Sequence, residues 1–263
     1  MMTDHPIPKD HPRYLSLTVR ESIINGMYNK VVAEAGLIAH GRGEAFDYIL
    51  GEKTPPFALK QEELAVLTLL EAKSPIISVN GNVAVLCPQE VVRFGKIINA
   101  PLEINLFYRS KEREEAIKNV LLEAGAKNIL GIDPDYQTVI TELSHSRRIV
   151  DSRGIATSDC VFVPLEDGDR TLALRKLGKT VVTIDLNPLS RTSLAASVAI
   201  TNNIIRAIPE MIKLAEKYAG ISDNLIKKHL INFNNKELLQ DSLKYMAERL
   251  ILLSCEEKLF NLG

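Results

Sequence analysis

The feature that most constrains this fold is a series of short apolar runs, rich in β-branched residues, that begins at residue 75. Each run is shorter than an ordinary helix, and segments with helical character lie between several of them. Nearly continuous apolar strands that alternate with helices are typical of a parallel sheet covered on both faces. We therefore predict an α/β fold with a Rossmann-like, mainly parallel sheet and helices on both faces. The expected strands are 75–79, 102–108, 128–132, 160–163, 180–184 and 197–200.

Helical segments flank this core at both ends. The apolar spacing predicts helix over residues 14–50, with a break near "AHGRGE", and again over 60–73. Within the core, Ser110 is placed to cap a helix that Gly125 would end. The expected organisation is one compact domain with three parts: an N-terminal helical segment (1–73), a Rossmann-like core (74–208) and C-terminal helices (209–263).

Charge and cysteine content narrow the class of partner. The formal net charge is −1, and no basic stripe is visible, so we expect small-molecule substrates and no nucleic acid. The three cysteines form no CxxC pair, which favours a reducing cytoplasm over a disulfide framework. No apolar run approaches the roughly 20 residues that span a bilayer, so we expect no membrane partner. The five histidines lack metal-ligand spacing, and we predict no protein metal site.

Polar residues follow the predicted strands. In open parallel sheets, ligands bind beyond the carboxyl ends of the strands, so these side chains are candidates for a site. They are Asn80, Arg109, Asp133, Glu166 with Asp167, and Asp185 with Asn187.

The segment "TIDLNPLSRTS" (183–193) is the most informative junction. Asn187 suits a helix N-cap and the following proline suits the first helical position, which predicts a helix from Pro188. Arg191 and Thr192 would then offer a guanidinium and a hydroxyl to phosphate oxygens, and Asp185 could accept from ribose hydroxyls. The alternative is that Asp185 caps a turn while Arg191 pairs with a surface carboxylate.

Two further stretches leave similar choices open. In "ITNNIIRAIP", Asn202 and Asn203 stand where a strand meets a helix, and simple N-capping is the preferred interpretation. In "HGRG", glycines flank Arg42, which would permit close approach of backbone or ligand, or form a plain turn. The helical pattern predicts that Arg20 is an ordinary exposed arginine of a helix. The GxxxxGK[ST] and GxGxxG signatures are missing, and no nucleophile elbow is present, so transfer at phosphorus or an acyl phosphate is the favoured chemistry.

Five stretches resemble the archaeal phosphopantothenate synthetase family, also called 4-phosphopantoate–β-alanine ligases. They are "HPRYLSL..RE", "GLIAHGRGEAFDYILGE", "INLFYRS", "SRGIATSDCVFVPLEDGDRT" and "TIDLNPLSRTS..A...ITNNIIRA". The resemblance covers nearly the whole chain. It implies a homodimeric, Rossmann-like enzyme of coenzyme A biosynthesis that condenses 4-phosphopantoate with β-alanine while ATP is cleaved to AMP and diphosphate.

The resemblance also implies which residues bind ATP. They are Arg20, Arg42, Asp185, Leu186, Asn187, Arg191, Thr192, Asn203 and Ile204. Mg²⁺ is expected to accompany the nucleotide, because charge at the reacting phosphorus must be offset. Arg109 is our candidate for the phosphate of phosphopantoate, and no catalytic residue is assigned.

Two other functions remain open from sequence alone. A nicotinamide-dependent oxidoreductase could use the same kind of sheet, although the glycine fingerprint is missing. A non-catalytic nucleotide sensor would bind ATP without releasing diphosphate.

Overall fold

A parallel sheet of six strands forms the centre of the computed structural model, which describes residues 7–142, 145–231 and 233–256. The strand order is β3-β2-β1-β6-β7-β8, and every neighbouring pair in this sheet is parallel. All six predicted strands are confirmed, and two of them have the predicted bounds. The strands are β1 (Pro75–Val79), β2 (Leu102–Ile104), β3 (Ile129–Leu130), β6 (Cys160–Phe162), β7 (Thr180–Ile184) and β8 (Val198–Ile200).

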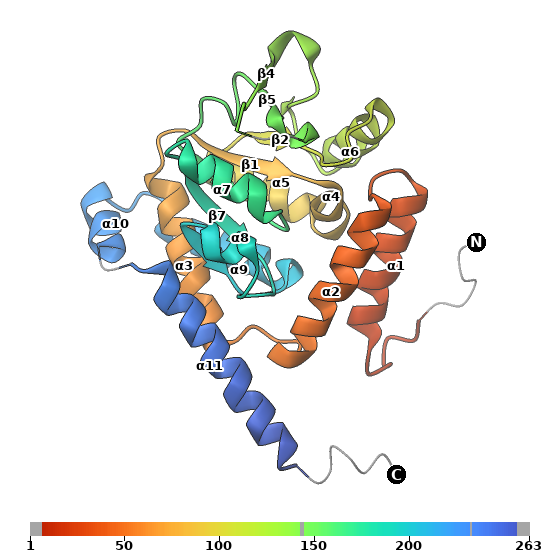
Figure 1. The fold of residues 1–263 in the computed structure, drawn as a ribbon, viewed down its shortest axis with the longest axis vertical. Coiled ribbons are helices and arrows are strands. Elements are labelled where there is room, and N and C mark those ends of the chain that lie inside the picture. The colour runs from red at the N-terminus through yellow and green to blue at the C-terminus, as the bar shows by residue number, and fades with distance from the viewer. Residues whose placement is uncertain (1–6, 143–144, 232, 257–263) are drawn as a thin grey trace.

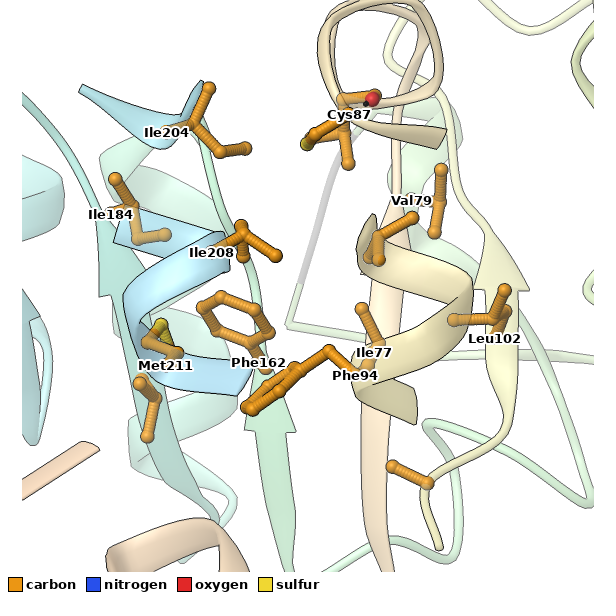
Figure 2. Packing of buried hydrophobic residues seen from close by; sticks show 14 of the residues in the cluster. Ile77, Val79, Cys87, Phe94, Leu102, Phe162, Ile184, Ile204, Ile208 and Met211 are labelled. Atoms are coloured by element: carbon orange, nitrogen blue, oxygen red, sulfur yellow. Dashed lines mark hydrogen bonds between the residues drawn. The ribbon is translucent and has the colours of Figure 1, made fainter. Parts of the chain in front are cut away.

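Alternation along the strands sends side chains to two separate cores. Ile77 and Phe162 face the larger core, whereas their neighbours Ile76 and Val161 face the smaller one. In the larger core, the Phe162 ring meets that of Phe94 edge to face with centroids 5.8 Å apart (Figure 2). Because both faces of the sheet are buried, its strands are mostly apolar, which agrees with the nearly continuous apolar runs in the sequence.

Helices cover the larger core. α5 and α9 lie across it and contact each other, and α3, α4 and α6 pack around them (Figures 1 and 2). The predicted cap is confirmed: Ser110 accepts from the backbone amide of Arg113 at the start of α6. The bounds are α3 (Pro56–Glu71), α4 (Gly81–Leu86), α5 (Pro88–Ile97), α6 (Lys111–Glu123) and α9 (Ile204–Tyr218).

The smaller core is closed by α7 (Gly168–Lys176) and by an antiparallel hairpin that the sequence did not predict. The hairpin pairs β4 (Gln137–Val139) with β5 (Ile149–Asp151), and Val150 contributes to the core. Two 3-10 turns, η1 (Pro134–Tyr136) and η2 (Ser146–Arg148), adjoin it.

The N-terminal helices form a pair beside the sheet (Figure 1). They are α1 (Tyr14–Tyr28) and α2 (Glu34–Leu50). The predicted break near "AHGRGE" is wrong, because α2 runs through that stretch. The chain turns earlier, over 29–33, where Lys30 adopts a positive φ of 63° and the two following valines are buried.

The C-terminal helices begin earlier than expected, since α9 starts at Ile204 and Pro209 lies inside it. The proposed part boundary at 208 therefore falls within a helix. α8 (Arg191–Ala195), α10 (Asp223–Leu230) and α11 (Asn235–Ser254) complete the fold, and α11 extends away from the body of the molecule (Figure 1). Residue 232 and residues 257–263 of the predicted C-terminal helical segment lie outside the described residues.

Candidate active site

A cavity of about 680 Å³ opens at the carboxyl ends of the parallel strands, with α1 and α2 forming its opposite wall. The strand order reverses between β1 and β6, which is where open parallel sheets leave a crevice for ligands. Asn80 sits at this reversal. Its amide donates to the carbonyls of Pro164 and Leu165, each at 3.1 Å, while its oxygen caps α4. The side chain thus ties the two halves of the sheet edge together and fixes the floor of the cavity.

Eight of the nine residues that the resemblance assigns to ATP line this cavity. They are Arg42, Asp185, Leu186, Asn187, Arg191, Thr192, Asn203 and Ile204. Sequence-predicted candidates Asn80, Glu166 and Asp167 also line it, whereas Asp133 and Arg109 do not.

The 183–193 junction differs in one respect from the prediction. The helix does not begin at Pro188: residues 187–190 form a turn, and α8 begins at Arg191 with Ser190 as its cap. Asn187 instead accepts from the amide of Leu189 at 2.9 Å, the local bond that makes asparagine a turn residue. The delayed start still leaves Arg191 in the first turn.

Asp185 does cap this turn. Its carboxylate accepts from the amide of Asn187 at 2.9 Å and from the hydroxyl of Ser190. Burial raises the pKa of Asp185, and hydrogen bonds from its own turn together with the charge of Arg42 oppose that rise. A carboxylate held this way is rigid, and each oxygen keeps capacity for another donor.

Arg191 reaches the carboxylate of Asp169 at 2.6 Å, with 73% and 62% of the two side chains exposed. The geometry of Arg191 is therefore that of the surface-pair alternative. Thr192 is buried and donates to the carbonyl of Glu166 at 2.9 Å, which joins the β7 loop to the β6 loop.

Asn203 caps α9, as the preferred interpretation of "ITNNIIRAIP" holds. Its amide also donates to Asp47 of α2 at 2.8 Å, and Asp47 is paired with Arg206. Behind them, Asn202 donates to the buried carboxyl of Glu62 at 2.7 Å. This network connects the β8 loop to α2 through Asp47 and to α3 through Glu62.

The two N-terminal arginines lie differently. Arg42 projects from the unbroken α2 and lines the cavity. Arg20 on α1 stands behind the lining, where it donates to Glu44 at 3.0 Å. Glu44 itself lines the cavity, so Arg20 reaches the site's edge through it.

Arg109 is engaged elsewhere. It donates to the carbonyls of Gly131 (2.6 Å) and Ile149 (3.3 Å) and pairs with Glu114. It thereby anchors the β3 loop and the hairpin rather than facing the cavity.

Sequence reasoning also missed four residues that line the site. Asp47 and Arg113 lie inside helices, where charged residues normally face water; Arg206 lies in the first turn of α9, and Arg147 stands beside a hairpin that was not predicted. Only the unusual density of arginine around 147–153 could have drawn attention to one of them.

Comparison with known proteins identifies the family. A family model described as phosphopantothenate/pantothenate synthetase matches residues 57–249. The chain belongs to this family. A 4-phosphopantoate–β-alanine ligase of Thermococcus kodakarensis is 49% identical over 251 residues, covering 95% of each chain. Ligases of the same name from Methanosarcina mazei and Methanospirillum hungatei are 46% and 41% identical, covering 97% and 93% of this chain and 99% and 98% of their own.

The part of the chain that the structure describes has neither a membrane-spanning helix nor a cluster of metal-ligating side chains. No helix there is long and apolar enough to cross a membrane. No group of three or more histidine, cysteine, aspartate or glutamate side chains there is arranged to hold a metal ion.

Proposed function

We propose that this chain is an ATP-dependent ligase that condenses 4-phosphopantoate with β-alanine to give 4′-phosphopantothenate, AMP and diphosphate. The observation that carries the proposal is the family membership, with relatives of that name 41–49% identical along nearly their full length. Eight of the nine residues that the resemblance assigns to ATP line one cavity, which is consistent with the proposal. The relatives' ligase names do not favour a nicotinamide-dependent oxidoreductase.

The proposed reaction has two steps. The carboxylate of phosphopantoate attacks the α-phosphorus of ATP, forming an acyl adenylate as the bond to diphosphate breaks. The amine of β-alanine then attacks the activated carbonyl, loses a proton and expels AMP. Neither step needs a protein nucleophile, which agrees with catalysis by positioning and positive charge.

In this proposal the β7 and β8 loops hold ATP. Asp185 accepts from the ribose, while Arg42, Arg191 and the α9 N-terminus that Asn203 caps face the phosphates. Arg20 projects from α1. To contact the nucleotide, its guanidinium has to break its ion pair with Glu44, or the two side chains have to move together.

Mg²⁺ would supply charge neutralisation at the phosphates. The residues present fit an ion that enters with ATP and keeps mostly phosphate and water ligands, since the cavity's carboxylates are dispersed and already engaged with arginines or turns. We further propose that the enzyme works as a homodimer in the cytoplasm, where its small charged substrates dissolve.

The deciding experiment supplies the purified protein with ATP, Mg²⁺, 4-phosphopantoate and β-alanine and quantifies AMP and diphosphate together. Equal amounts of both products, dependent on both co-substrates, are expected. ATP protection in thermal unfolding without any diphosphate release would instead support the nucleotide sensor.

A further inference from the structure

The residues proposed to bind ATP come from separate parts of the fold. Arg42 projects from α2, in the N-terminal helix pair, whereas Asn203 and Ile204 stand where β8 leads into α9. The main helix contacts of α2 are with α1, α4 and α11 rather than with α9. A nucleotide that contacts both α2 and the start of α9 therefore needs another link to fix their separation.

Asp47 of α2 supplies this link. It lines the same cavity as Arg42 and is 6% exposed. One of its oxygens accepts from the side-chain amide of Asn203 at 2.8 Å and from Nη1 of Arg206 at 3.1 Å, and the other accepts from Nη2 of Arg206. Within the described residues, all side-chain hydrogen bonds of Asp47 thus go to the cap and the first turn of α9.

Asn202 supports these contacts from behind, and none of it is exposed. Its oxygen accepts from the backbone amide of Asn203 at 2.8 Å and from Nε of Arg206 at 3.3 Å. Its amide donates to Glu62 at 2.7 Å. Every nitrogen of the Arg206 guanidinium is therefore bonded, either to Asn202 or to Asp47.

The bonds of Asn203 also fix the direction in which its side chain faces. Its oxygen accepts from the backbone amide of Ile205 at 3.3 Å, and its amide nitrogen donates to Asp47. With one acceptor and one donor committed, the amide has a single orientation. Loss of the Asp47 carboxylate would leave the helix cap but remove the partner of the amide nitrogen.

The ion pair between Asp47 and Arg206 is a poor source of stability, because the cost of burying two charges offsets most of their attraction. Arg206 also neutralises a carboxylate that would otherwise repel phosphates at the start of α9. The pair therefore provides a fixed contact without net charge between two walls of the cavity.

We propose that Asp47 is a positioning residue for ATP. By holding Asn203 and Arg206, it keeps the N-terminus of α9 at a fixed distance from Arg42, so that the helix end and this arginine contact the same nucleotide. The inference rests on the proposed ligase function, which supplies the nucleotide. It assigns Arg206 to Asp47 and not to a phosphate, although Arg206 lines the cavity.

The first test is Asp47→Asn, which keeps the size of the side chain but offers one acceptor oxygen instead of two. It cannot serve Asn203 and both Nη atoms of Arg206 as the carboxylate does. The value of kcat/KM for ATP is expected to fall roughly 10- to 100-fold, the loss that follows when a reacting group is displaced by about 1 Å. KM for β-alanine, measured at saturating ATP, should stay the same. An unchanged or increased kcat/KM for ATP would overturn the proposal.

Two further backgrounds show whether Asp47 acts through its two partners. In Asn203→Ala the amide that Asp47 holds is absent, and in Arg206→Gln the carboxylate has lost the charge that neutralises it. Adding Asp47→Asn should therefore cost much less in either background than in the wild type. A loss as large as that in the wild type, in either background, would overturn the proposal.

The matched control is Asp151→Asn. Asp151 is also a buried aspartate paired with an arginine, Arg153, and neither residue lines the cavity. This variant should be less stable than the wild type but keep its kcat/KM for ATP. An equal fall in kcat/KM in the control would mean that destabilisation alone explains the effect of Asp47→Asn, which would overturn the proposal.

Thermal unfolding separates this inference from the ligase proposal. ATP should raise the wild-type Tm, and Asp47→Asn should reduce that increase. A wild type that ATP protects but that releases no AMP or diphosphate would refute the ligase, and the response of Asp47→Asn to ATP would still decide the role of Asp47. An undiminished increase in Tm would overturn that role.

Discussion

At the scale of the residue, Arg191 is the clearest test of nucleotide binding. Its only ion-pair partner among the described residues is Asp169, and both side chains are largely exposed. An exposed pair contributes about 0–1 kcal/mol to stability, so Arg191→Ala should leave the Tm nearly unchanged. Loss of a phosphate contact should lower kcat/KM for ATP by roughly 2–4 kcal/mol in activation free energy.

The control for this prediction is Asp169→Asn, which breaks the same ion pair but leaves the arginine. It should keep near-normal ATP kinetics. If Arg191→Ala unfolded early yet showed normal kinetics when folded, Arg191 would be a structural residue.

Glu62 makes the stability depend on pH. Burial raises its pKa to about 8, with Glu210 adding to the rise and Asn202, Arg206 and Lys213 opposing it. The folded state therefore holds a proton that the unfolded chain releases above its ordinary pKa near 4.5. The stabilisation that this proton provides is fully present below pH 4.5. It is lost as the pH rises from there toward 8, where the free energy of unfolding falls by at most about 1.4 kcal/mol per pH unit.

The comparison of Glu62→Gln with the wild type isolates this effect from other buried acids such as Glu103. The free energy of unfolding of Glu62→Gln minus that of the wild type should increase between about pH 5 and pH 8. Above about pH 8 this difference should stay constant. Urea unfolding across this range measures it. A difference that does not change with pH would mean that Glu62 is ionised in the folded protein.

Among the local contacts, the cap by Asn203 was predicted, the turn cap by Asp185 was one of two interpretations left open, and the helix cap expected at Asn187 was wrong. Asn203 and Asp185 bond to amides within two residues, so their capping roles follow from the sequence itself. Arg109 and Arg113 could not be told apart, because what separates them is which carbonyls of distant segments they meet: Gly131 and Ile149 for one, Val31 for the other.

At the scale of the element, two helical glycines should respond in opposite ways to alanine. In α2, a Cβ at Gly41 would meet nothing within 4 Å, so Gly41→Ala should stabilise the protein by about 0.5–1 kcal/mol. At the start of α4, a Cβ at Gly81 would lie 2.2 Å from the carbonyl oxygen of Val31. Gly81→Ala should therefore destabilise the protein by about 1–3 kcal/mol.

Chemical unfolding of the two variants side by side measures both effects. Because Asn80, Gly81 and Asn82 all line the cavity, Gly81→Ala should also weaken substrate binding. If the two variants were equally stable, the turn before α2 would have to move at little energetic cost. The close approach of Gly81 to the carbonyl oxygen of Val31 would then not contribute to stability.

Element prediction was best for the buried strands and weakest for exposed or glycine-containing segments. β1 and β7 were bounded correctly because burial on both faces leaves a short run that is mostly apolar and rich in β-branched residues. β4 was missed because two of its three residues are exposed and it carries no such run. The glycines of "HGRG" suggested a break, yet tertiary contacts of α2 override their low helix propensity.

At the scale of the whole molecule, the tip of α11 predicts self-association. Leu250, Ile251 and Leu252 are 49%, 65% and 67% exposed, on a helix that extends away from the body (Figure 1). A second copy packed symmetrically against this apolar end would bury it. Light scattering at micromolar concentration should give twice the 29.2 kDa of one chain.

Ile251→Asp should shift this equilibrium toward the monomer. Lys244→Asp, a charge change at an exposed position of the same helix, should not. A wild-type mass of 29.2 kDa would contradict the predicted dimer.

The pairing of β1 with β6 also determines the order in which the nascent chain can fold during synthesis. Pro75 lies opposite Cys160, so one edge of β1 has no partner until the ribosome has added the intervening segment. At roughly 5–20 residues per second, that edge stays open for several seconds of synthesis. The part of the cavity that is lined by the loops after β7 and β8 forms later still, when β8 emerges. Ribosome-stalled chains that end before Cys160 should be cut readily by protease, and chains stalled well beyond Tyr218 should resist it.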